Sequence, residues 1–426
     1  MKLKLIYAFL RFGCLPGGLI LTWIGMASPP FQGEWGFVGL ALKALATGLG
    51  LVIATVGLFV IHNVYFSRNR AWVDPELDIE TWSITRDQQH NSNTDLTWFQ
   101  GAFYLAHAVS PYHFGSADCK IQVKRSPDGL HWEQVAVLGK GNDDVRDPKF
   151  AVIGDRLCLY VLLNRALQPL PYTTRYAWTN DGNHWSDLCS LGHEGWLFWR
   201  PKTLDGRVWY VPAYWHEFNH NVLFKTWDGA NFEMVATIHK GRFINEPEIE
   251  FLADGTLLAT GRVDYDKRDF QQVIGIPQSS TIISVAEPPY VSWQDTAEDQ
   301  TTRLDGPVMF RYGNHIFAVG RAHPYFNTIF PRRGAVLAKK RTAIYEVRPE
   351  GLTYLSDLPS AGDTSYAGVV VKDGFVYVSY YTSDIRRDSI WLFGMMEPSE
   401  IRMAKIALER LVQAAERRKK PTRKEK

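Results

Sequence analysis

Charged and polar side chains recur in this sequence directly before a series of predicted strands. They are Asn93, Asp95, Arg146, Asp147, Arg200, Glu246, Glu248, Asp305, Asp363 and Tyr366. Charges are costly to bury unless they are paired, so the repetition needs an explanation. One explanation is a polar pocket for a ligand, with carboxylates as general acid or base. The other is a ring of Arg–Asp ion pairs that holds neighbouring elements together.

The elements that must position these residues are six strand–turn–strand units, each with a glycine in its turn. They span residues 98–109, 150–163, 202–215, 249–263, 308–322 and 369–381. Their regular spacing favours a radial repeat over two packed β-sandwich domains, and predicts an all-β, six-bladed β-propeller. The first strand of each blade lines the central axis of a propeller. The residues just before those strands should therefore meet at one mouth.

A short Asp-Gly turn also recurs, as SPDGLHW from Ser126, TNDGNHW from Thr179 and TWDGANF from Thr226. Asp-Gly supplies a residue that tolerates positive φ, and the Asp side chain can accept backbone N–H bonds inside the turn. We expect this turn to join the third and fourth strands of a blade, with the aromatic residue packed beneath it. Its predicted role is structural.

These features resemble the sialidases and related exo-glycosidases. The recurring turn is close to their Asp-box, although one residue shorter. Residues 245–258 followed by Arg262 resemble the sialidase segment in which a Glu precedes a strand–turn–strand that ends in a substrate-binding Arg. The Ser365-Tyr366-Ala367-Gly368 segment resembles the last-blade segment with the nucleophilic Tyr. The resemblance covers roughly residues 85–400.

The resemblance implies hydrolysis of a glycosidic bond in the central pocket. It makes Tyr366 the nucleophile and Glu246 its base, with Glu248 as the alternative base, because a carboxylate beside a phenol can accept its proton. Asp118, ahead of the first Asp-Gly turn, is the acid/base candidate by position. The substrate-binding candidates are Arg146, Asp147, Arg200, Glu248, Arg262, Asp305, Arg321 and Asp363.

The sequence also departs from the sialidase pattern. Sialidases clamp the substrate carboxylate with three arginines, and the first should open blade one, where this chain has residues 90–93, HNSN, without arginine. Arg262 matches the second, Arg303 or Arg321 could be the third, and Arg146 lies one blade late. The substrate is therefore a sugar or glycoconjugate that the sequence does not identify.

Three alternatives stay open. The segment Arg146-Asp147-Pro148 also resembles five-bladed furanosidases, in which Asp95, Asp147 and Glu246 would serve as base, modulator and acid with inversion. A second alternative is a non-catalytic propeller that binds a glycan or a protein. The third is a platform for membrane-protein assembly.

The composition restricts the partners. The 426 residues carry a formal net charge of +2, which argues against a general nucleic-acid binder. The cysteines, Cys14, Cys119, Cys158 and Cys189, suggest no disulfide framework, and the histidines show no local metal-ligand spacing. We therefore expect a carbohydrate ligand, no cofactor and no metal. The oligomeric state stays open.

The N-terminal residues are apolar over 12–27 and 44–61, and the linker 28–36 carries no Lys or Arg. Lys2, Lys4 and Arg11 precede the first segment, and Arg68 and Arg70 follow the second. The positive-inside rule then predicts a two-pass membrane anchor with both ends, and the propeller, on the cytoplasmic side of the bilayer. A cleaved signal peptide is the alternative for the first segment.

The predicted domain organisation therefore has four parts. Residues 1–66 form the anchor, 67–84 a linker with a possible closing strand, 85–405 the propeller, and 406–426 a short helix and a basic tail.

Overall fold

The computed structural model describes residues 2–29, 36–139, 141–164, 172–264, 279–324 and 334–419. The chain divides into two compact units. The smaller consists of Met1–Asn69 with Arg386–Ser389, and the larger of Arg70–Ile385 with Ile390–Lys426.

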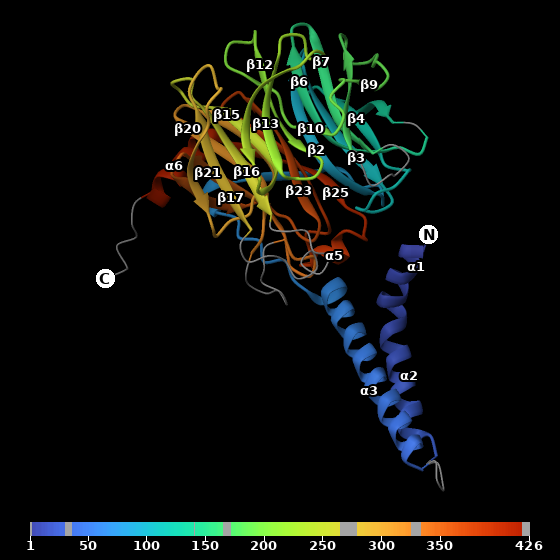
Figure 1. Ribbon diagram of the computed structural model, residues 1–426. Helices are drawn as coiled ribbons and strands as arrows, with labels where there is room; N and C mark the ends of the chain where they lie inside the picture. The colour runs from blue at the N-terminus through green and yellow to red at the C-terminus, as the bar shows by residue number, and fades with distance from the viewer. Residues whose placement is uncertain are drawn as a thin grey trace, which may run out of the picture. The chain divides into compact units, whose positions relative to one another are not determined.

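The larger unit is a six-bladed β-propeller, as the hairpin spacing predicts. Within the described ranges its strands form six antiparallel sheets, each running from an inner to an outer strand (Figure 1). Blade one contains β2 (His90–Phe99), β3 (Ala102–Ser110), β4 (Lys120–Ser126) and β5 (Glu133–Leu138). Blade two contains β6 (Asp144–Ile153), β7 (Arg156–Asn164), β8 (Thr173–Thr179) and β9 (Cys189–Ser190). Blade three contains β10 (Trp196–Phe198), β11 (Lys202–Thr203), β12 (Trp209–Trp215), β13 (His220–Thr226) and β14 (Glu233–Lys240). Blade four contains β15 (Phe243–Phe251), β16 (Leu257–Asp264), β17 (Ser280–Ala286) and β18 (Gln294–Asp299). Blade five contains β19 (Asp305–Tyr312), β20 (His315–Ala322), β21 (Arg341–Arg348) and β22 (Gly351–Asp357). Blade six contains β23 (Thr364–Lys372), β24 (Phe375–Thr382), β25 (Glu400–Ala407) and β1 (Glu80–Thr85).

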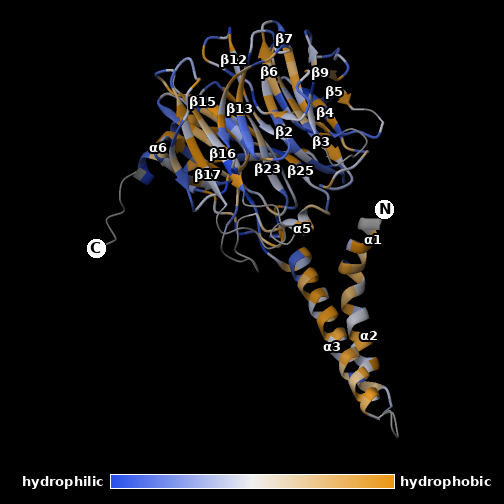
Figure 2. Cartoon of the chain, viewed as in Figure 1, coloured by the Kyte–Doolittle hydropathy of each residue, from blue (hydrophilic) through white to orange (hydrophobic). Residues whose placement is uncertain are grey.

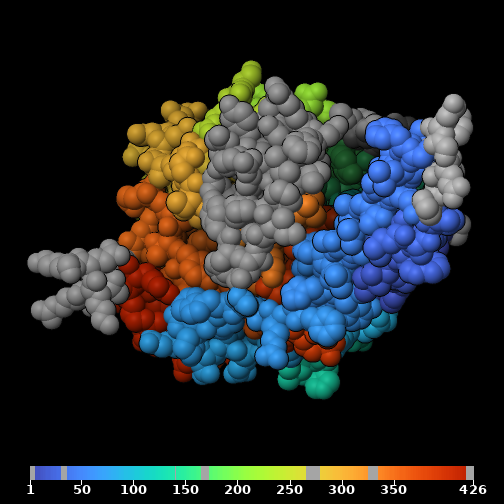
Figure 3. All heavy atoms as spheres, turned by 90° about the horizontal axis from the view of Figure 1, so that it is seen from below, coloured from blue at the N-terminus to red at the C-terminus, as the bar shows by residue number. Residues whose placement is uncertain are grey.

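The two ends of the propeller sequence meet in blade six. Strand β1 pairs antiparallel with β25, with Glu80 opposite Lys405. Helix α6 (Leu408–Lys419) follows β25, and Arg417 Nη1 lies 2.7 Å from Glu76 Oε2 in η4 (Pro75–Leu77). Figure 3 shows this C-terminal helix, in red, beside blue N-terminal residues. The ring is therefore closed by a strand from the opposite end of the sequence.

The hydrophobic core lies between neighbouring blades. One cluster joins Ala106 and Ile121 of blade one to Leu159 of blade two, and another joins Phe317 of blade five to Val378 of blade six. All five side chains are fully buried. Because each blade buries both of its faces against its neighbours, its strands contain long apolar runs.

The recurring Asp-Gly turn joins the third and fourth strands of blades one to three, as expected. Asp128 Oδ1 accepts hydrogen bonds from the backbone N–H groups of Leu130 at 2.8 Å and His131 at 2.9 Å. Asp181 and Asp228 make the equivalent bonds in their turns. The hydroxyl of the leading Ser or Thr accepts from the Gly N–H in each turn. The turn is therefore closed by its own side chains.

Five of the inner strands carry a bulge at the same place. Asn93, Asp147, Glu246, Gly306 and Tyr366 have φ of 47°, 52°, 43°, 55° and 44°, and each sits where the pairing register shifts. In blade three the corresponding place is the break between β10 and β11, which contains Arg200. A left-handed non-glycine residue is strained, and bulges of this kind redirect side chains. These bulges position the residues at the start of the inner strands, the end of the propeller that we call the mouth.

Arg200 ties four other blades together on the propeller axis. Its Nε lies 3.0 Å from Asp95 Oδ1 of blade one, and its Nη1 lies 3.2 Å from Glu248 Oε2 of blade four. It also donates to the carbonyl oxygens of Pro307 in blade five, at 2.9 Å, and Ala367 in blade six, at 2.5 Å. Burial lowers the pKa of Arg200, but Asp95 and Glu248 raise it above its ordinary value. We call Asp95, Arg200 and Glu248 the axial cluster.

The smaller unit contains two apolar helical segments. They are Leu5–Ala27, which comprises the end of α1 (Lys2–Ala8), η1 (Phe9–Gly13) and α2 (Cys14–Ala27), and Gly36–Phe66, which comprises α3 (Gly36–Ile61) and η3 (His62–Phe66). Both are long and apolar enough to cross a membrane, by length and composition, and in Figure 2 most of their residues are coloured as hydrophobic. A core helix or a signal sequence would pass the same test.

Glycines let α2 and α3 approach closely. A Cβ added to Gly18 would lie 2.3 Å from the backbone N of Ala54, and one added to Gly57 would lie 2.4 Å from that of Leu15. Gly25 and Gly50 approach the opposite helix in the same way. Small residues at such a contact are typical of helix pairs in membranes. The two helices therefore form a closely packed hairpin.

The axial cluster predicts a large stability effect. Replacing Arg200→Met should lower the free energy of unfolding by about 3–5 kcal/mol, because the buried Asp95 loses its cation and the buried Glu248 keeps only the Lys202 ammonium, 3.7 Å from its Oε1. Denaturant unfolding of the full chain, followed by tryptophan fluorescence, measures the change. The exposed Arg207→Met in the same blade is the control, with an expected change within about 0.5 kcal/mol. Adding Asp95→Asn and Glu248→Gln to Arg200→Met should recover part of the lost free energy of unfolding. A triple variant less stable than Arg200→Met alone would contradict this account.

Candidate functional site

The mouth brings Tyr366 of β23 and Glu246 of β15 into direct contact. The Tyr366 hydroxyl donates a hydrogen bond of 2.6 Å to Glu246 Oε1. Glu246 Oε2 accepts from the backbone N–H of Gly306 in β19 at 2.7 Å, and Arg262 Nη1 lies 2.7 Å from Oε1. Three blades thus supply the groups that surround one carboxylate.

The surroundings shift the pKa values of this pair. Burial raises the pKa of Glu246 above its usual range, and Asp305 adds to the rise, while Arg262 opposes it. Burial and the neighbouring charge of Glu246 raise the pKa of Tyr366 well above its usual value. Tyr366 is therefore a neutral phenol at pH 7, with its hydrogen bond directed at a carboxylate whose proton affinity is increased.

A network of arginines and carboxylates continues from Glu246. Arg262 Nη2 lies 3.2 Å from Asp264 Oδ2, and Arg303 Nη1 lies 3.0 Å from Asp264 Oδ1. Arg303 Nε also lies 2.7 Å from Oδ1 of the fully buried Asp305. Burial alone would raise the pKa of Asp305, but Arg303, His323 and Arg262 hold it well below its usual range.

Arg321 of β20 adjoins the other side of Tyr366. Its guanidinium lies 5.0 Å from the centroid of the Tyr366 ring and is only 2% exposed. Its Nη2 donates to the Tyr381 hydroxyl at 2.7 Å and lies 3.2 Å from Asp363 Oδ1. Burial works against ionisation of Arg321, but the neighbouring acidic groups keep its pKa far above the neutral range.

The other predicted residues have partners outside the Tyr366–Glu246 pair. Arg146 holds Asp144 through two guanidinium nitrogens, at 2.8 to 3.0 Å, and Asp147 accepts a hydrogen bond from Asn93 Nδ2. Arg200 and Glu248 belong to the axial cluster. Asp118 is exposed in the loop between β3 and β4, where its backbone N–H donates to Ser116 Oγ at 3.2 Å.

Among the residues that the structure describes, each predicted substrate-binding arginine is already paired with a carboxylate. The pairs are Arg146–Asp144, Arg200–Asp95, Arg200–Glu248, Arg262–Glu246, Arg262–Asp264 and Arg321–Asp363. The ion-pair interpretation of the mouth residues thus applies at least in part. An anionic ligand would have to compete with these internal carboxylates for the guanidinium groups.

Sequence reasoning missed several members of this centre, among them Asp264, His323 and Tyr381. All three lie within one residue of the end of a second strand, β16, β20 or β24. The second strand of each hairpin returns to the mouth from which the first one starts, so its last residues face the same space. A further signal was a proline that follows four of the mouth residues, at positions 148, 201, 247 and 307. Proline is normally excluded from central strands, so this repeat marks the bulges.

Among the described residues, cavities adjoin both groups of buried charges. One of about 550 Å³ is lined by Trp72, Arg303, His323, Tyr354 and other residues of blade five. The other, of about 220 Å³, lies around the axial cluster and is lined by Asp95, Arg200 and Lys202 among others. Because Arg303 and His323 also contact Asp305, the larger cavity adjoins the arginine–carboxylate network.

Comparison with known proteins identifies the fold. No protein-family model matches the chain, and no curated protein matches it. Among solved structures, a Trypanosoma rangeli sialidase mutant with trans-sialidase activity matches with a TM-score of 0.58 at 12% identity. That match covers 81% of this chain but 61% of the sialidase, so the chain spans about three fifths of its length.

Two further structures are similar. A protein of unknown function from Dyadobacter fermentans matches with a TM-score of 0.56 at 12% identity, over 77% of this chain and 99% of the other. The endosialidase of phage phi92 matches with a TM-score of 0.53 at 10% identity, over 78% and 69%. At this identity the similarity identifies a sialidase-like propeller fold.

Proposed function

We propose that this protein is a glycoside hydrolase that cleaves a sugar or glycoconjugate at the mouth of the propeller. The observation that carries the proposal is the 2.6 Å hydrogen bond from the Tyr366 hydroxyl to Glu246 Oε1. A buried phenol aimed at a buried carboxylate is the arrangement that a tyrosine nucleophile requires. The similarity to solved sialidases supports the same class of reaction.

In the proposed reaction, the Tyr366 oxygen attacks the anomeric carbon while its proton passes to Glu246 Oε1. Arg262 stabilises the ionised Glu246 before the reaction, and the Gly306 N–H fixes the orientation of the carboxylate. Asp118 donates a proton to the departing oxygen and then takes a proton from water, which attacks the anomeric carbon, while Glu246 returns its proton to the Tyr366 oxygen as the bond between the sugar and Tyr366 breaks.

The pairing of the arginines bears on the substrate. A sialic acid carboxylate is best held by a guanidinium fork, yet Arg262 is 12% exposed and already holds Glu246 and Asp264. A neutral sugar has no carboxylate, so it can bind without displacing the ion pairs of Arg262 with Glu246 and Asp264. The proposed substrates therefore include neutral glycosides as well as sialosides.

The second candidate function is a propeller that binds a glycan without cleaving it. It is favoured by the internal pairing of the mouth arginines. Ion pairs that hold neighbouring blades together would by themselves explain these arginines, without any catalytic role. Binding of a sugar without turnover, by a folded chain, would distinguish it from the hydrolase.

The Tyr–Glu pair predicts the behaviour of two variants. Tyr366→Phe and Glu246→Gln should each lower kcat by about 10²-fold or more, because one removes the nucleophilic oxygen and the other the base. The assay is hydrolysis of a panel of aryl glycosides, neutral and sialylated, by the full chain. Tyr380→Phe is the matched control, since the buried Tyr380 hydroxyl on the adjacent strand donates to the Pro359 carbonyl oxygen instead. Full activity in Tyr366→Phe would exclude the tyrosine nucleophile.

The proposed acid predicts a dependence on the leaving group. Asp118→Asn should slow hydrolysis of alkyl glycosides by about 10²-fold or more, because an alkoxide needs a proton to leave. A nitrophenyl glycoside should be cleaved at a nearly unchanged first step, since nitrophenolate leaves without protonation. Burst kinetics on both substrates separate the two steps, and the exposed Asp373→Asn is the control. Equal losses on both substrates would rule out this role.

The location of the protein is part of the proposal. We propose that the helical hairpin α2–α3 anchors the chain in the lipid bilayer, and the positive-inside rule predicts that both ends of the chain lie in the cytoplasm. A C-terminal green fluorescent protein fusion should then fluoresce, and a C-terminal alkaline phosphatase fusion should be inactive. An active phosphatase fusion would place the propeller outside.

A further inference from the structure

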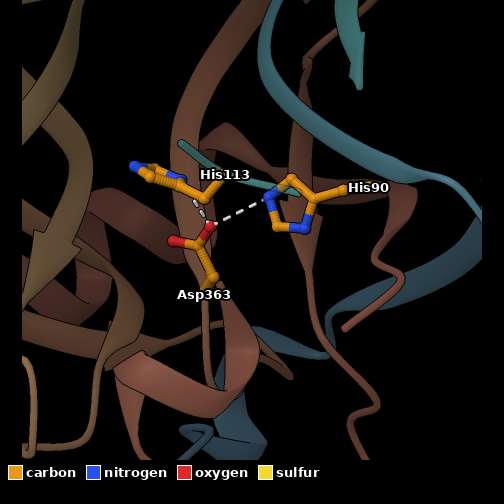
Figure 4. A group of neighbouring side chains, drawn as sticks. All are labelled: His90, His113 and Asp363. Carbon is orange, nitrogen blue, oxygen red and sulfur yellow. Dashed lines mark hydrogen bonds and ion pairs between the residues drawn. The ribbon is translucent and has the colours of Figure 1, made fainter. Parts of the chain in front are cut away.

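A second cluster of polar side chains lies at the mouth, formed by His90, His113 and Asp363. His90 begins β2, His113 lies in the loop between β3 and β4, and Asp363 precedes β23. His90 Nε2 lies 3.1 Å and His113 Nδ1 lies 2.7 Å from the same oxygen, Asp363 Oδ2 (Figure 4). The three candidate donor atoms all lie within 4.8 Å of one another.

The hydrogen bond of His90 determines which of its nitrogens carries the proton. His90 Nδ1 lies 2.8 Å from the carbonyl oxygen of Glu397, which can only accept, so Nδ1 is protonated. In neutral His90 the lone pair of Nε2 then faces Asp363 Oδ2, which is itself an acceptor. His90 is fully buried, and its Nε2 has no hydrogen-bond partner among the described residues. Two opposed lone pairs in a buried site call for a cation between them.

Asp363 is fixed by its other oxygen. Asp363 Oδ1 accepts from Trp391 Nε1 at 2.7 Å and from the Tyr381 hydroxyl at 2.9 Å, and Arg321 Nη2 lies 3.2 Å away. These contacts leave Oδ2 directed at the two imidazole rings. A carboxylate held by outer hydrogen bonds and a histidine fixed by a backbone carbonyl are the supports that metal ligands require.

We propose that His90, His113 and Asp363 form a binding site for a divalent metal ion. Two imidazole nitrogens and one carboxylate oxygen suit Zn²⁺ and the related ions Co²⁺ and Ni²⁺. Three protein ligands leave a fourth position for water or for an oxygen of a bound molecule. The His113 side chain is 22% exposed, which gives the ion a path to the site.

The neighbouring charges set the expected strength of binding. Arg321 contacts Asp363, and Arg146 Nη1 donates to the His113 carbonyl oxygen at 2.9 Å. Both guanidinium groups repel a metal ion at this site, so we expect the site to bind the ion more weakly than a closed structural zinc site does. The competing arrangement is a proton on His90 Nε2, which would satisfy the same pair of atoms without a metal.

Metal titration of the full chain, first stripped with a chelator, distinguishes the two. Co²⁺ is the probe, because its visible absorption reports bound nitrogen and oxygen ligands, and Zn²⁺ is then added to displace it. We expect one Co²⁺ per chain. His113→Ala should lower the affinity for Co²⁺ by at least about tenfold, because loss of a group that only supports a metal ligand already costs that much. His131→Ala is the matched control. Its Nδ1 lies 2.7 Å from Asp128 Oδ2 without a second histidine, and its side chain is 85% exposed.

A thermal readout keeps the test independent of spectroscopy. Zn²⁺ should raise the unfolding temperature of the wild type and of His131→Ala, but not that of His113→Ala or His113→Gln. If the wild type binds no Co²⁺, or if both His113 variants bind it as tightly as the wild type, the proposal is wrong and a proton holds the cluster. Because no glycoside is turned over, the result does not depend on the proposed hydrolysis.

Discussion

The geometry of the mouth depends on the charge that the propeller buries on its axis. Arg200 is the only residue of blade three in the axial cluster, yet it contacts blades one, four, five and six. A buried guanidinium must have partners in every direction in which it has a donor. The blades can therefore not rotate or slide independently without leaving a donor of Arg200 unpaired. This constraint fixes the relative positions of the strands that carry Glu246, Gly306 and Tyr366.

The bulges convert this fixed axis into a site. Glu246, Gly306 and Tyr366 are the left-handed residues of three consecutive inner strands. A Cβ on Gly306 would lie 2.7 Å from the Tyr366 ring, so a glycine is required there both for its φ and for the space that the ring occupies. The same residue donates its N–H to Glu246. The strain of the bulges therefore brings base and phenol together without any long side-chain reach.

The fold can be predicted from the sequence more completely than the candidate site can. The fold follows from local signals, since each hairpin is specified by its own turn and alternation. Glu246 and Tyr366 could be placed because each directly precedes the apolar part of an inner strand, although the strands β15 and β23 begin a few residues earlier. Asp264 and His323 could not, because their position depends on where a second strand ends. His90, His113 and Asp363 come from a strand start, a loop and the last blade. A search for local ligand spacing cannot find such a cluster, because only the closure of the ring assembles it.

Arg321 links the two proposed sites. One edge of its guanidinium contacts Asp363, and its face packs on the Tyr366 ring. Asp363 compensates the charge of Arg321, and a metal ion on Asp363 Oδ2 would reduce that compensation. The positive potential at the face of Tyr366 would then increase, which favours negative charge on the phenol oxygen. A metal ion at the proposed His90–His113–Asp363 site would therefore be coupled electrostatically to the Tyr366–Glu246 pair through a single buried arginine.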